Sequence, residues 1–120
     1  MAANPLVVLY VEDAAFIRVL YAQWLAAPQR RIVSVADCAS AHDALGKQNV
    51  DLLITDIQLP DGSGLDLARE ALRRNPGLPV IVCSGEKLMD VTGLLGPTAH
   101  MLSKPIDFDE LEALIEKLVQ

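Results

Sequence analysis

Five polar residues, far apart in the sequence, each follow a short apolar segment: Glu12, Asp13, Asp56, Ser84 and Lys104. Three carboxylates brought close together repel one another unless a cation or a proton intervenes. Carboxylate oxygens in a small site suit Mg²⁺, and an ammonium group suits a phosphoryl oxygen. A serine hydroxyl can donate a hydrogen bond to a second phosphoryl oxygen. If the fold brings these residues together, they predict a site for Mg²⁺ and a transferred phosphoryl group.

The segments that precede these residues are predicted strands. Short β-branched runs alternate with longer segments of helical period, which predicts an α/β fold with a doubly wound, five-stranded parallel sheet and helices on both faces. The predicted strands are 6–11, 31–36, 51–56, 79–84 and 100–103, and the predicted helices are 14–27, 40–48, 65–74 and 107–119. Ligands of such sheets bind outside the carboxyl ends of the strands, where the five residues fall.

Two helices call for separate expectations. Segment 86–98 contains Gly93, Gly96 and Pro97, so we expect a short or irregular fourth helix there. In the first helix, Trp24 falls on the apolar stripe, and we expect it in the core.

The composition narrows the classes of function. The 120 residues are expected to form a single domain with no effector domain. Sixteen acidic against ten basic residues give a net charge of −6, which disfavours direct binding to nucleic acid. The chain has no apolar run near the roughly 20 residues that span a bilayer, and Cys38 and Cys83 have no metal-site or disulfide spacing. We therefore expect a cytoplasmic protein without a membrane partner.

Over its whole length the sequence resembles the receiver domain of two-component response regulators. The motifs that carry the resemblance occur in the family's order, each at the end of a predicted strand. They are the acidic pair Glu12-Asp13, the single Asp56, the loop Leu59-Pro60-Asp61-Gly62, the pair Ser84-Gly85 and the pair Lys104-Pro105. The resemblance implies a flavodoxin-like strand order, 2-1-3-4-5, and a cis peptide bond between Lys104 and Pro105.

The resemblance also implies roles for these residues. Asp56 would be the phosphoacceptor, taking a phosphoryl group from a phosphohistidine. Asp13 and Asp56 would ligate Mg²⁺ directly together with the backbone carbonyl of Gln58, and Glu12 would reach the ion through water. Lys104 would pair first with the aspartate and then with the phosphoryl group. The protein would be a signalling switch that catalyses its own phosphorylation and dephosphorylation, not a metabolic enzyme.

Ser84 and Met101 are the expected switch residues. In the family, the hydroxyl residue swings toward the phosphoryl group while a Tyr or Phe, three residues before the lysine, rotates inward. Here that second position is Met101, and serine replaces the commoner threonine. Phosphotransfer chemistry is therefore expected to be intact, and the readout to differ from the usual one. The partners implied are a histidine kinase or a histidine phosphotransfer protein and a downstream protein target.

Other interpretations remain open at this point. The runner-up is a receiver-fold interaction module whose output is atypical or independent of phosphorylation. A phosphatase of the haloacid-dehalogenase type would need a second acid where Gln58 stands, and a cobalamin module would need a histidine there. Individually, Glu12 and Asp13 could simply cap a helix, and Lys104 could be a surface lysine.

Overall fold

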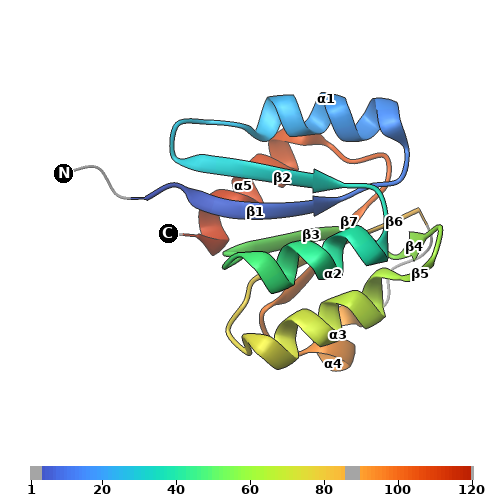
Figure 1. Ribbon diagram of the computed structural model, residues 1–120. Coiled ribbons are helices and arrows are strands. Elements are labelled where there is room, and N and C mark those ends of the chain that lie inside the picture. The colour runs from blue at the N-terminus through green and yellow to red at the C-terminus, as the bar shows by residue number, and fades with distance from the viewer. Residues whose placement is uncertain (1–3, 86–89, 120) are drawn as a thin grey trace.

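The computed structural model describes residues 4–85 and 90–119, which form a three-layered α/β domain (Figure 1). Five parallel strands pair in the order β2-β1-β3-β6-β7, which confirms the expected order 2-1-3-4-5 of the five main strands. The strands are β1 (Leu6–Val11), β2 (Arg30–Val35), β3 (Leu52–Asp56), β6 (Val80–Ser84) and β7 (Ala99–Ser103). The helices are α1 (Ala15–Leu25), α2 (Cys38–Lys47), α3 (Gly64–Arg74), α4 (Val91–Leu95) and α5 (Phe108–Leu118).

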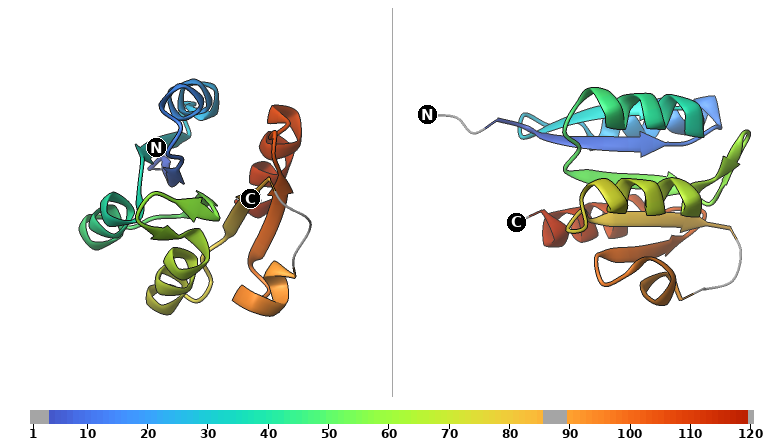
Figure 2. Two further views of the ribbon diagram at one scale, coloured as in Figure 1. Left: turned by 90° about the vertical axis from the view of Figure 1, so that its right-hand side faces the viewer. Right: turned by 60° about the horizontal axis from the view of Figure 1, so that its bottom comes forward.

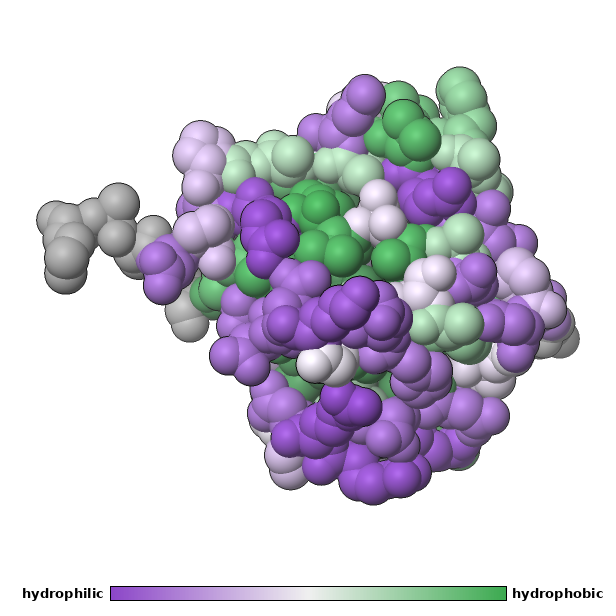
Figure 3. Space-filling model, viewed as in Figure 1, coloured by the Kyte–Doolittle hydropathy of each residue, from purple (hydrophilic) through white to green (hydrophobic). Residues whose placement is uncertain are grey.

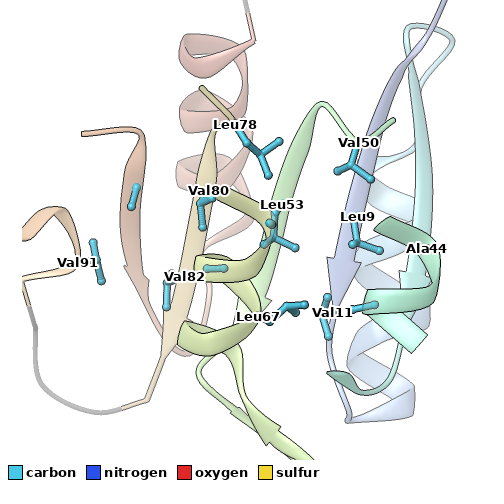
Figure 4. Packing of buried hydrophobic residues seen from close by; sticks show 14 residues of the cluster. Leu9, Val11, Ala44, Val50, Leu53, Leu67, Leu78, Val80, Val82 and Val91 are labelled. Atoms are coloured by element: carbon cyan, nitrogen blue, oxygen red, sulfur yellow. The ribbon is translucent and has the colours of Figure 1, made fainter. Parts of the chain in front are cut away.

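The helices divide between the two faces of the sheet. Side chains of α2, α3 and α4 pack on one face, and those of α1 and α5 pack on the other, as the end-on view shows (Figure 2). Successive residues of a strand point to opposite faces, so Leu9 and Val11 enter the first core while Val8 and Tyr10 enter the second. Figure 4 shows Leu9 and Val11 together with Leu53 and Val82 in the first core. Strands β3 and β6 are buried along their whole length, which explains their continuous apolar runs.

Aspartate side chains begin three of the helices. Asp37 accepts a hydrogen bond from Ser40 N at the start of α2, and Asp107 accepts one from Glu110 N at the start of α5. The short fourth helix is confirmed within the described residues: α4 has five residues, is capped by Asp90 and ends at Gly96, whose φ is 108°. That positive φ is the left-handed region that glycine adopts without a steric penalty.

The loop after β3 is more regular than a turn. Its residues form a two-stranded antiparallel hairpin, β4 (Gln58–Leu59) and β5 (Gly62–Ser63). The amide of Gly64 donates to the carbonyl of Ile57 across the base of the hairpin. The chain therefore leaves the carboxyl end of β3 along a fixed path.

The expected burial of Trp24 is wrong. Its side chain is 50% exposed, and its ring packs edge-on against Phe108 of α5 with 5.4 Å between centroids. The reason is that α1 lies over the outer strands, so α5 covers only one of its flanks (Figure 2). Phe16 and Val19 of α1 are exposed as well, and hydrophobic atoms gather over this helix in Figure 3, whereas α2 and α3 present mostly hydrophilic ones.

Gly64, the first residue of α3, lies against the end of β3. A Cβ atom at this position would lie 1.7 Å from the carbonyl oxygen of Asp56, so Gly64→Ala must push the start of α3 away from the strand. We expect the free energy of unfolding, measured by urea denaturation, to fall by about 2 kcal/mol. Gly46→Ala, in α2, is the matched control, since its Cβ would meet only an arginine side chain at 3.9 Å. That variant should be unchanged or up to about 1 kcal/mol more stable, and equal losses in both variants would contradict the interpretation.

Candidate functional site

The carboxyl edge of the sheet brings together the polar residues singled out in the sequence. Glu12 and Asp13 follow β1, Asp56 and Ser84 are the last residues of β3 and β6, and Lys104 follows β7. Asp13, Asp56, Ser84 and Lys104 line one cavity of about 470 Å³, together with Gln58 and its neighbours in the loop after β3. Neighbouring parallel strands end at the same edge, so residues up to 92 positions apart become adjacent.

Lys104 is held by two carboxylates. Its Nζ lies 2.7 Å from Asp56 Oδ1 and 3.2 Å from Glu12 Oε1. The backbone amide of Lys104 donates to the Ser84 carbonyl, which fixes the start of this side chain at the end of β6. The following Lys104–Pro105 peptide bond is cis, as expected. Lys104 is therefore a member of the site and not a free surface lysine.

Glu12 contacts both the start of α1 and Lys104. Its Oε2 accepts a hydrogen bond from Ala14 N at the start of α1, while Oε1 faces Lys104. Arg18 was not foreseen: its guanidinium donates to the backbone carbonyl of Glu12 at 2.8 Å and to that of Asp13 at 3.4 Å. The signal in the sequence is an arginine one turn into the helix that follows an acidic pair. Arg18 thus fixes the backbone that carries both acids.

The three acids lie close enough together for one cation to contact all of them. Carboxylate oxygens of Glu12, Asp13 and Asp56 lie within 4.8 Å of one another. Asp56 is 5% exposed, and its Oδ2 is buried with no hydrogen-bond partner among the described residues. A buried carboxylate oxygen is costly unless a ligand, a proton or a donor satisfies it. The oxygen donors therefore fit a hard divalent cation such as Mg²⁺.

The electrostatics of the site follow from burial and like charges. Burial and the neighbouring Glu12 raise the pKa of Asp56 from 3.8 to about 7, although Lys104 opposes the shift. Burial alone would raise the pKa of Glu12 too, but its interactions with Asp56, the Ala14 amide and Lys104 outweigh burial and lower that pKa. Burial would lower the pKa of Lys104, but its pairing with Asp56 and Glu12 raises it. Lys104 therefore stays charged while Asp56 takes up a proton readily.

The two expected switch residues lie in different surroundings. Ser84 is buried, 6% exposed, and lines the cavity beside Asp56. Met101, in β7, is half-buried and pairs with Val82, and its side chain packs against the core under α2, α3 and α4. Residues 86–89, at the start of the segment where the short fourth helix was expected, lie outside the described residues.

The sequence matches a known protein family over most of its length. The model of the response regulator receiver domain matches residues 8–116. The chain belongs to this family. It is thus a signalling module of two-component systems, and its fold and the order of its motifs are those of a receiver domain.

Individual response regulators are also similar to this chain in sequence or in fold. The chain is 28% identical over 119 residues to TcrX of Mycobacterium tuberculosis, covering 98% of this chain and 51% of TcrX. It is 32% identical over 109 residues to the response regulator protein PilR of Pseudomonas aeruginosa, covering 89% of this chain and 24% of PilR. A response regulator receiver protein from Sinorhizobium medicae has the same fold, with a TM-score of 0.87, 22% identity, and coverage of 98% of this chain and 97% of that one. The chain thus spans about half the length of TcrX and about a quarter of the length of PilR.

No helix within residues 4–85 and 90–119 is long and apolar enough to cross a membrane.

The raised pKa of Asp56 predicts that the stability of the metal-free receiver domain depends on pH. The folded state binds the Asp56 proton more tightly than the unfolded state does. The stabilisation that this proton gives is therefore complete below about pH 4 and is lost as the pH rises toward about 7. Asp56→Asn abolishes this loss. The variant should therefore gain stability relative to wild type across that interval, by about 1–3 kcal/mol.

Urea denaturation in EDTA at several pH values measures the difference. Asp43→Asn is the control, because Asp43 is exposed on α2 and, among the described residues, its one ion pair is with the exposed Lys47. If the difference in free energy of unfolding between wild type and Asp56→Asn does not change with pH, the raised pKa of Asp56 is contradicted.

Proposed function

We propose that this receiver domain accepts a phosphoryl group on Asp56 from a phosphohistidine of a histidine kinase or a histidine phosphotransfer protein. The observation that carries the proposal is the state of Asp56: one carboxylate oxygen is paired with Lys104, and the other is buried and unsatisfied among the described residues. A carboxylate oxygen attacks phosphorus, and the bond from phosphorus to the imidazole nitrogen breaks. The histidine keeps the electron pair, and the product is an acyl phosphate on Asp56.

Mg²⁺ is part of the proposal. Asp13 and Asp56 would hold it directly with the backbone carbonyl of Gln58, and Glu12 would reach it through water. When bound, Mg²⁺ supplies positive charge that offsets the acids and the incoming phosphoryl oxygens. The mutual proximity of the three carboxylates supports this ligand set, and Gln58 lines the same cavity.

Lys104 and Ser84 complete the chemistry. Lys104 moves from Asp56 to a phosphoryl oxygen, since its ammonium follows the negative charge as the charge shifts outward. The Ser84 hydroxyl donates to a second phosphoryl oxygen. Both residues line the cavity that contains Asp56, which supports their roles. Positioning and neutralisation of charge are what phosphoryl transfer requires of a protein.

Phosphorylation would then alter binding to a downstream protein target through Ser84 and β7. Ser84 pairs with Ser103 in β7, and Met101 lies two residues earlier in that strand. A hydroxyl drawn toward the phosphoryl group would shift β6 against β7 and α4. The alternative is an interaction module whose binding does not depend on phosphorylation.

Acetyl phosphate tests the transfer. Incubation with Mg²⁺ should add the mass of one phosphoryl group, because a small acyl phosphate can replace the phosphohistidine donor. The adduct should be absent with EDTA and in Asp56→Asn, and present in the surface control Asp43→Asn. No adduct in wild type, or an adduct that survives Asp56→Asn, would overturn the phosphoacceptor assignment and favour the alternative.

Amide hydrogen exchange tests the switch. Beryllofluoride with Mg²⁺, which mimics an aspartyl phosphate, should slow exchange in Ser84, α4 and β7, and leave α2 unchanged. Ser84→Ala should bind beryllofluoride but show a smaller change in β7, because the hydroxyl that couples the site to the strand is missing. An identical response in wild type and variant would contradict coupling through Ser84.

A further inference from the structure

Asp61, at the tip of the β4–β5 hairpin, is bound to a different part of the domain. Its Oδ1 accepts a hydrogen bond from Cys38 N at 2.8 Å, and its Oδ2 accepts one from Ala39 N at 3.0 Å. These are the first two amides of α2, which have no acceptor within the helix. One carboxylate thus satisfies both, and the helix dipole favours its negative charge. The two amides lower the pKa of Asp61, so it is ionised at neutral pH.

Helix α2, whose first amides bind Asp61, is packed into the domain. Its residues Ala41 and Ala44 are buried in the core, and Asp37 caps its start by accepting a hydrogen bond from Ser40 N. A second contact lies alongside, because the Cys38 thiol faces the carbonyl of Ser63 in β5 at 3.9 Å. The start of α2 therefore contacts the hairpin at two points, Asp61 at the tip and Ser63, which pairs with Gln58.

The other end of the hairpin lies at the phosphorylation site. Gln58 is three residues before Asp61 and two after Asp56, and it pairs with Ser63 across the hairpin. The base is fixed by the bonds from Gly64 N to the Ile57 carbonyl and from Ile57 N to the Cys83 carbonyl. Base and tip are both held, so the peptide plane that carries the Gln58 carbonyl has little freedom to rotate.

We propose that Asp61 is a positioning residue that orients the Gln58 carbonyl toward the cation by tying the hairpin to the start of α2. The inference rests on the proposed function, since the Gln58 carbonyl matters only if the site binds Mg²⁺. Partners that orient a metal ligand typically change metal affinity by about 10- to 100-fold when they are removed. Asp61 touches neither the cation nor the phosphoryl group, and it acts through the backbone of four residues.

The structure supplies a matched control. Asp37 and Asp61 are both aspartates that accept hydrogen bonds from the first turn of α2, but Asp37 precedes the helix in the chain while Asp61 belongs to the hairpin. Asp37→Ala therefore weakens the helix start alone. Asp61→Ala weakens the same helix start and also releases the hairpin. A loss of Mg²⁺ affinity in Asp61→Ala but not in Asp37→Ala would therefore come from release of the hairpin and not from the weaker helix start.

Isothermal titration of wild type with Mg²⁺ comes first, followed by the two variants and Asp61→Asn, with thermal midpoints in parallel. Asp61→Ala should bind Mg²⁺ about tenfold more weakly, and Asp61→Asn, which keeps one acceptor oxygen, should lose less. Asp37→Ala should have a lower thermal midpoint and a Mg²⁺ affinity within about twofold of wild type. Phosphorylation of Asp61→Ala by acetyl phosphate should be slow at low Mg²⁺ and recover at saturating Mg²⁺.

Unchanged Mg²⁺ affinity in Asp61→Ala, or an equal loss in Asp37→Ala, would overturn the positioning role and leave the proposed function intact. Wild type that binds no Mg²⁺ would overturn the proposed function and this role with it. If Asp61→Ala does not fold, Asp61→Asn against Asp37→Ala gives the same comparison, with equal affinities counting against the proposal.

Discussion

Four charged side chains share the carboxyl edge of the sheet, and the rest of the site depends on how their charges balance. Lys104 lies between Asp56 and Glu12, and Asp13 stands beside them. With all four ionised, two negative charges remain uncompensated in a place that is partly closed to water, where charges interact strongly. Burial and the nearby Glu12 raise the pKa of Asp56 to about 7, and uptake of a proton by Asp56 lessens this repulsion. A site in this condition favours any ligand that adds positive charge, which is why the acids fit a divalent cation.

Such a charge distribution persists only if the backbone cannot relax away from it. Asp56 ends a strand that is buried along its whole length, and Gly64 packs directly on its carbonyl group. Arg18 grips the carbonyls of Glu12 and Asp13, and the Lys104 amide bonds to the end of β6. The apolar cores on both faces hold the strands in register, so their stability offsets the cost of crowding the acids.

The two faces of the sheet differ in how they meet the site. On one face, α2 is linked to the loop after Asp56 through Asp61, so the packing of a helix constrains the loop. On the other, Glu12 accepts a hydrogen bond from the Ala14 amide just before α1, and the outer side of that helix, with Phe16 and Val19, is apolar and exposed. Met101 packs against the first core and is not among the described residues that line the cavity beside Asp56.

The sequence by itself determined the α/β class, the five strands, the short fourth helix and the residues at each strand end, because alternating apolar periods and local turn signals are properties of neighbouring residues. It also placed Asp56 and Lys104 in one site through their motifs. Only the tertiary structure decided that Trp24 lies half outside the core, since that depends on how far α5 reaches over α1. The tertiary structure alone also showed that Arg18 binds the Glu12 carbonyl, that Asp61 binds the start of α2, and that one oxygen of Asp56 is buried and unsatisfied among the described residues. Distances between side chains from separate elements, and the desolvation they impose, exist only once the sheet has been assembled.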